Sequence, residues 1–170
     1  GTGDVVNAAV SSVSGIVTST IQNAGKIGSA AIGATSDVIR GVIQGVKEVG
    51  GDLGLAAKGV VLGLIRGTGQ VGTQAFDTIA NTSGDIVKDT AELLGDVALA
   101  AKGAVEGAIE GAKEIGLNVE EAASAAATGA VKAAYEISSE VGTKVRHAVT
   151  GTISGTKVVI KEPFQSEKKK

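Results

Sequence analysis

Few residues of this chain have the types and spacing that catalysis or cofactor binding needs. The segment GTGQVG at residues 67–72 matches the glycine pattern with which dinucleotide-binding proteins admit a pyrophosphate at the start of a helix. Its glycines recur at matching positions of an internal repeat, where Gly72 aligns with Gly28 and Gly116. Because the repeat accounts for these glycines without a nucleotide, we expect no dinucleotide site.

Metal and acid–base chemistry are also poorly represented. The chain has no cysteine, and His147 is its single histidine, so a soft or imidazole ligand set cannot gather at one place. No pair of carboxylates stands in a recognisable acid–base setting. We therefore predict that the protein is not an enzyme, and we expect no catalytic residue, metal, cofactor or small-molecule substrate.

The composition is unusual for a domain with a single central core. The chain has 170 residues, of which 26 are glycine, with two phenylalanines, one tyrosine and no tryptophan or methionine. Globular cores usually rely on aromatic and leucine side chains, whereas the large apolar residues here are mostly valine and isoleucine, spread along the whole length. This distribution favours a linear or repetitive structure. The formal net charge of −2 gives no support for nucleic-acid binding.

The elements that would position any site follow an eleven-residue repeat from Val5 to Ile160. Five of its eleven positions are predominantly apolar, and Glu120 is the single charged residue at any of them. Eleven residues make three helical turns at about 3.67 residues per turn, close to the α-helical value. The apolar positions then share one side of a helix, glycine- and alanine-rich positions flank that side, and most charges lie opposite.

A longer repeat of 44 residues, which is four elevens, is superimposed on the short one. Its similar segments are 15–28, 59–72, 103–116 and 147–160, with a half-step copy at 37–50 and a further pair at 51–59 and 95–103. Duplication of an eleven-residue unit without loss of phase explains both periods.

The sequence thus predicts an all-α fold with right-handed, coiled-coil-like packing, and two arrangements stay open. One is a nearly continuous amphipathic helix of about 155 residues, roughly 230 Å long. The other is a set of helical hairpins that bend near 50–52, 81–85 and 117–118. The unbroken phase favours the long helix. The expected organisation is a frayed start at 1–4, a repeat region at 5–160 and a lysine-rich tail at 161–170.

Such a helix needs a neighbour, because glycine costs roughly 1 kcal/mol relative to alanine inside a helix. We predict that a second surface covers an aliphatic assembly or lipid face and approaches closely at glycines spaced by four residues. The predicted face is Val17, Ile21, Ile39, Ile43, Val61, Ile65, Val105, Ile109, Val149 and Ile153. The predicted close-packing glycines are Gly41, Gly45, Gly59, Gly63, Gly67, Gly103, Gly107, Gly111, Gly151 and Gly155.

This periodicity resembles that of exchangeable apolipoproteins, synucleins and perilipins, which lay amphipathic helices on lipid. It is also similar to hendecad coiled coils and to the late-embryogenesis proteins linked to desiccation. The chain departs from them in lacking proline between its repeats and in its high glycine content. The segment VTGTISGTKVVIKEPF at 149–164 resembles uncharacterised Gly/Ala-rich bacterial proteins, which implies no mechanism.

Three functions follow as expectations. The first is a structural protein whose copies assemble as a homo-oligomer into a bundle, tube or filament. The alternative is a lipid- or membrane-surface-binding protein, in which the same aliphatic face lies on acyl chains. The third is a desiccation protectant. No secretory leader is visible, which favours a cytoplasmic or membrane-associated protein.

Overall fold

The computed structural model describes residues 2–23 and 28–161, which fold almost entirely into helices. The described helices are α1 (Thr2–Asn23), α2 (Gly28–Glu48), α3 (Leu53–Thr68), α4 (Gly72–Glu92), α5 (Val97–Ile115), α6 (Val119–Ile137) and α7 (Ser139–Val149). A short antiparallel hairpin of β1 (Gly151–Ile153) and β2 (Thr156–Val158) follows. The predicted all-α class is confirmed. The single long helix is wrong, because the helices fold back on one another as a compact bundle.

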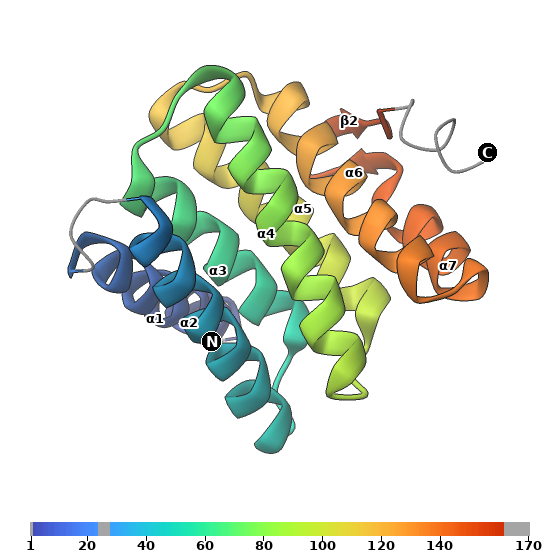
Figure 1. Ribbon diagram of the computed structural model, residues 1–170, viewed down its shortest axis with the longest axis horizontal. Helices are drawn as coiled ribbons and strands as arrows, with labels where there is room; N and C mark the ends of the chain where they lie inside the picture. Colours follow the sequence, from blue (N-terminus) through green and yellow to red (C-terminus); the bar gives the residue numbers. More distant parts are fainter. Residues whose placement is uncertain (1, 24–27, 162–170) are drawn as a thin grey trace.

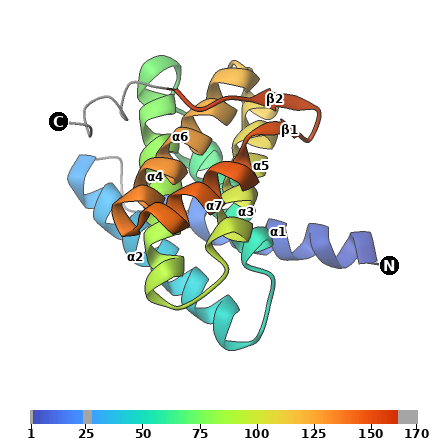
Figure 2. The ribbon, with the colours of Figure 1, turned by 90° about the vertical axis from the view of Figure 1, so that its right-hand side faces the viewer.

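The helices form two layers, seen face-on in Figure 1 and edge-on in Figure 2. One layer holds α1, α3 and α5 in this order, and the other holds α2, α4 and α6. The chain is therefore a row of three helical hairpins, α1–α2, α3–α4 and α5–α6. Helix α7 packs on α5 and α6 at the far end of the row. Each 44-residue repeat corresponds to one hairpin.

Side-chain caps and left-handed residues set the ends of several helices. Asp52 and Asp96, at equivalent repeat positions, accept backbone N–H groups at the starts of α3 and α5. Asn118 accepts the N–H of Glu121 at 2.9 Å and caps α6 in the same way. Gly69 and Gly116, with φ of 60° and 80°, end α3 and α5 in the left-handed region that glycine favours.

The expected bends at 50–52 and 117–118 fall between helices, but the bend expected at 81–85 is wrong, because α4 runs through it. Packing overrides the weak helix propensity of this segment. Gly84 lies beside the backbone of Gly129 on α6, and Ser83 is fully buried. Turns between α3 and α4, between α4 and α5, and between α6 and α7 were not predicted. At the start, helix α1 includes residues expected to fray, and the tail from 162 onward lies outside the described residues.

The last repeat also departs from the prediction, because the helix ends at Val149 instead of continuing to residue 160. Gly151 has φ of 94° and opens β1. Ser154 and Gly155, with φ of 49° and 79°, form the turn of the hairpin. Two successive residues at positive φ are the signature of a type I′ turn, whose twist matches a two-stranded ribbon. Gly155 therefore forms the turn, Gly151 lies where the helix gives way to the strand, and neither is a close-packing helix glycine.

Candidate interaction surfaces

The ten aliphatic residues predicted to form an assembly or lipid face are all buried within this one chain. Val17, Ile21, Ile39, Ile43, Val61, Ile65, Val105, Ile109, Val149 and Ile153 are each at most 8% exposed. They belong to a single core that runs along the row of hairpins. The aliphatic stripe is therefore covered by other helices of the same chain and needs no second copy for that purpose.

Glycines of α3 lie against the backbone of α1 at a constant sequence offset. A Cβ atom added to Gly63 would lie 2.5 Å from the carbonyl oxygen of Ser14 and 2.8 Å from Cβ of Val17. Gly59 and Gly67 contact α1 in the same way, each with partners 46 and 49 residues earlier. A Cβ atom at Gly59 or Gly63 would overlap α1, so the interface requires glycine at these two positions, whereas the contacts at Gly67, from 3.1 Å upward, are tight without overlap.

The same offset recurs between α3 and α5. A Cβ atom added to Gly107 would lie 2.5 Å from the carbonyl oxygen of Lys58, 49 residues earlier, and 3.1 Å from Cβ of Val61, 46 residues earlier. Gly111 meets the side chain of Ile65. Gly103, in turn, lies on the backbone carbonyl of the residue 49 positions earlier. Each hairpin thus docks on the preceding one through glycines at equivalent repeat positions. These glycines contact a ridge formed by the residues 46 and 49 positions earlier.

The second layer uses one glycine in this way. Gly129 of α6 lies on the backbone carbonyl of Ala80 of α4, again 49 residues earlier. Hairpin docking therefore involves close backbone contact in both layers. Six of the ten predicted close-packing glycines make such contacts: Gly59, Gly63, Gly67, Gly103, Gly107 and Gly111.

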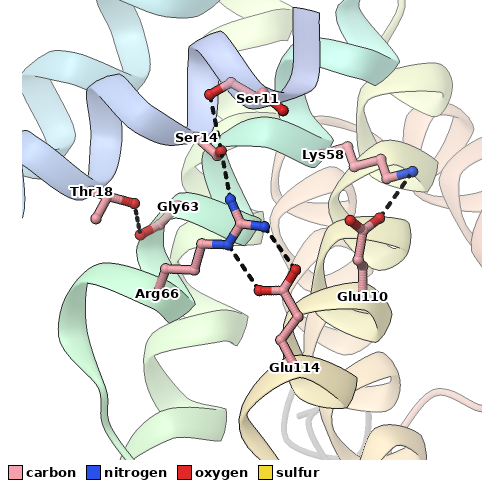
Figure 3. Close-up of polar contacts among 8 residues, drawn as sticks. All are labelled: Ser11, Ser14, Thr18, Lys58, Gly63, Arg66, Glu110 and Glu114. Atoms are coloured by element: carbon pink, nitrogen blue, oxygen red, sulfur yellow. Dashed lines mark hydrogen bonds and ion pairs between the residues drawn. The ribbon is translucent and has the colours of Figure 1, made fainter. Parts of the chain in front are cut away.

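Charged side chains at the edge of the first layer join successive hairpins (Figure 3). Arg66 donates to both carboxylate oxygens of Glu114 at 2.8 and 2.7 Å, and its third nitrogen donates to Ser14 Oγ at 3.1 Å. This one guanidinium therefore connects all three hairpins. Hydrogen bonding to Arg66 lowers the pKa of the Glu114 carboxyl. Lys58 and Glu110 form a further ion pair at 3.3 Å.

The second layer has equivalent ion pairs and two half-buried carboxyls. Arg40 of α2 bridges Asp89 at 3.2 Å and Glu92 at 2.6 Å on α4, and Lys88 pairs with α6. Burial raises the pKa of Asp89, although the charge of Arg40 opposes this. Burial also raises the pKa of Asp85, one turn earlier, where the charge of Lys88 opposes this. These two aspartates are therefore costly to ionise in the folded state.

The first hairpin carries the same glycines without a partner. Gly15 is the repeat counterpart of Gly59 and Gly103, and Gly41 is the counterpart of Gly129, 88 residues later. A Cβ atom added to either Gly15 or Gly41 would meet nothing within 4 Å, and Gly45 is equally open. The outer side of α1 and α2, at the left of Figure 1, is thus an uncovered version of the surface that hairpins use to dock.

We call this uncovered surface the first-hairpin face. Its exposed members are Ala8, Ser12, Gly15, Ile16 and Ser19 of α1, together with Gly41 and Gly45 of α2. These α1 residues recur at helical spacing, so they share one side. Ile16 is 52% exposed and is the one large apolar side chain in the set. The sequence predicted Gly41 and Gly45 as close-packing glycines but could not indicate that they would be open.

The opposite end of the row is capped. Helix α7 packs on α5 and α6, and β2 lies against α6. The ring of Tyr135 on α6 fills the space beside Gly142 of α7, and the Arg146 guanidinium lies 5.7 Å from the centre of that ring. The N–H of Lys161 donates to Thr128 Oγ1 at 2.8 Å and holds the end of the described chain against α6. Among residues 2–23 and 28–161, only the first hairpin therefore presents an uncovered docking surface.

The structure also places the glycine-rich segment 67–72 and the single histidine, His147. Segment 67–72 forms the turn from α3 to α4, where Gly67 contacts Ile21 and Gly69 ends the helix. His147 is exposed on α7. Among the described residues, no three histidine, cysteine or acidic side chains gather as a metal site.

Two further findings bear on the class of protein. In the part of the chain that the structure describes, no helix combines the length and apolar character needed to cross a membrane. Comparison with protein-family models, curated proteins and solved structures gave no match for this chain.

Proposed function

We propose that the protein is a non-enzymatic structural protein whose copies associate through the first-hairpin face. One observation carries this proposal. Glycines of α3, α5 and α6 receive the preceding hairpin in close backbone contact, while their counterparts Gly15 and Gly41 are open. The face therefore has the shape that already binds helices elsewhere in the molecule.

Energetics support the proposal. A glycine in a helix costs roughly 1 kcal/mol relative to alanine, and close packing of another backbone offsets that cost. Gly59, Gly63 and Gly67 obtain this compensation from α1. Gly15, Gly41 and Gly45 obtain none from the part of the chain that the structure describes. A helix placed over them would compensate them as well and would cover Ile16.

The proposal includes a packing geometry. Helices that dock at offsets of 46 and 49 residues carry the eleven-residue stripe on facing sides. A hendecad period favours right-handed packing. We assign this right-handed geometry both to the contacts between hairpins and to the contacts of the first-hairpin face with a second copy.

The test is the mass of the protein in solution as a function of its concentration, measured by light scattering after size exclusion. The wild-type chain should associate as the concentration rises. Ile16→Asp should stay folded and monomeric, because the site is on the surface of the monomer and a buried, unpaired carboxylate opposes association. Ser36→Asp, an exposed site on α2 outside the face, is the matched control and should associate like wild type. A wild-type chain that stays monomeric up to millimolar concentration would refute the proposal.

The lipid-surface alternative makes a different prediction. Because the ten aliphatic residues are buried, the bundle must open before they can reach acyl chains. Circular dichroism and near-ultraviolet spectra with anionic vesicles would then report loss of tertiary contacts with retained helix. Self-association in buffer without vesicles favours the structural function.

A further inference from the structure

Both ends of the hairpin row matter for the form of the assembly. The first-hairpin face is open. The surface of α5 and α6 that would dock on the glycines of a following hairpin lies under α7 and the β-hairpin. Assembly of copies head to tail needs both surfaces free. The described residues leave only one of them free.

The residues of the last hairpin that correspond to this ridge are also buried. Val17 and Ile21 of α1 form the ridge that enters the glycines of α3. Their counterparts 88 residues later, Val105 and Ile109 of α5, are 0% and 2% exposed. A second copy that offered its last hairpin would therefore present the polar outer side of α7, where Lys144 and His147 are exposed. Capped termini of this kind stop the growth of a repeat array.

From these observations we infer that the partner of the first-hairpin face is the same face of a second copy, related by a two-fold axis. This inference rests on the proposed function and specifies its geometry: a closed dimer and not a tube or filament. In a two-fold interface the same surface patch of each copy contacts its counterpart on the other copy, so the interface needs no second kind of surface.

The face has the shape that such pairing requires. Ile16 is β-branched, like Val17 and Ile21, which pack on glycines inside the molecule. Ile16 of one copy can therefore lie over Gly15 and Ser12 of the other copy, and the reverse contact forms at the same time. The small side chains of Ser12 and Ser19 allow the two α1 helices to approach closely.

The charge distribution also permits self-pairing. A two-fold interface doubles any net charge that its surface carries, which opposes association. Residues 8–22 of α1 contain no charged side chain. On α2, Asp37 and Glu48 are exposed at helical spacing with Gly41 and Gly45, and Arg40 is already paired with Asp89 and Glu92 on α4. The α1 part of the face is therefore uncharged, and the inferred two-fold axis lies there, so that α1 pairs with α1 without repulsion.

Cysteine crosslinking tests this geometry, because the chain has no cysteine of its own. Ser12→Cys lies on the first-hairpin face, and Lys144→Cys lies on the capped end, both at exposed positions. Under mild oxidation, Ser12→Cys should give a covalent dimer and no larger species, and Lys144→Cys should stay uncrosslinked. The double variant should also stop at the dimer.

The possible failures are distinguishable. A ladder of higher species from the double variant means head-to-tail contact, which overturns the two-fold inference but keeps the proposed self-association. A chain that stays monomeric by light scattering overturns the proposed function itself. Gly15→Leu provides the second readout: it should fold like wild type, since the space beside Gly15 is open, and should weaken dimerisation at least tenfold. Undiminished dimerisation of Gly15→Leu would place the interface elsewhere and overturn the inference.

Discussion

Gly63 of α3 lies directly on the backbone of Ser14 of α1, so that a Cβ atom at Gly63 would stand 2.5 Å from the Ser14 carbonyl oxygen. Gly107 stands in the same relation to Lys58, at the same sequence offset. The two contacts show that one docking geometry is used twice along the row. Glycine is therefore needed at these positions because the backbone of the neighbouring hairpin leaves no room for a side chain.

The first prediction contrasts two glycines of similar sequence context. Gly63→Ala should lower the free energy of unfolding by about 1–3 kcal/mol, because the methyl group forces α1 and α3 apart. Gly41→Ala, which fills open space on α2, should raise it by about 0.5–1 kcal/mol through helix propensity. Urea denaturation at low protein concentration measures both. Equal effects of the two substitutions would contradict the assigned contacts.

The second prediction concerns Leu94, which has φ of 63° and is 87% exposed in the turn between α4 and α5. Its repeat counterpart is Gly50, with φ of 71°. A leucine in the left-handed region costs about 1 kcal/mol or more. Leu94→Gly should therefore stabilise the fold by about 1 kcal/mol, measured by thermal and urea unfolding. Val49→Gly, exposed but outside the left-handed region, is the control and should bring no gain.

The third prediction concerns pH and Asp85. Burial raises the pKa of Asp85 in the folded state above its value of 3.8 in an unfolded chain, so the folded state binds a proton more readily. Stability from this group is thus fully present below pH 3.8 and is lost as pH rises through the folded-state pKa. Asp85→Asn should accordingly stabilise the protein at pH 7 and change little at pH 3.

The matched control for Asp85 is Asp77→Asn, an exposed aspartate on the same helix. It should leave the free energy of unfolding nearly unchanged at both pH values. A gain for Asp85→Asn that is as large at pH 3 as at pH 7 would mean that ionisation of Asp85 is not its source.

The fourth prediction concerns the pair Arg66 and Glu114, whose side chains are 39% and 36% exposed. Because this pair lies at the surface, a double-mutant cycle should give a coupling energy of about 0.2–1 kcal/mol that shrinks in high salt. Glu114 has a lowered pKa, so its contribution is present above the unfolded-state value of 4.5 and is lost as pH falls. A cycle with no coupling at neutral pH and low salt would show that the ion pair does not join the hairpins.

The sequence by itself determined the helical class and the side of the helices that is buried. A period of eleven places the aliphatic residues on one side of a helix, and all ten residues predicted from that stripe are buried, although Ile153 lies on β1 and not on a helix. The sequence also located the start of α6, since Asn118 and Glu121 have the spacing of an N-terminal cap. These features depend on local periodicity, which a single chain displays directly.

Only the tertiary structure decided how the chain turns and what covers each face. Because 44 residues are four elevens, the phase is the same for a straight helix and for hairpins stacked at a constant offset, so the phase cannot separate them. The sequence also does not distinguish the structural roles of its glycines. Gly69 ends a helix in the left-handed region, Gly84 lies inside α4 beside another backbone, and Gly15 is open. Each role depends on which residue, distant in the sequence, occupies the space that the missing side chain leaves.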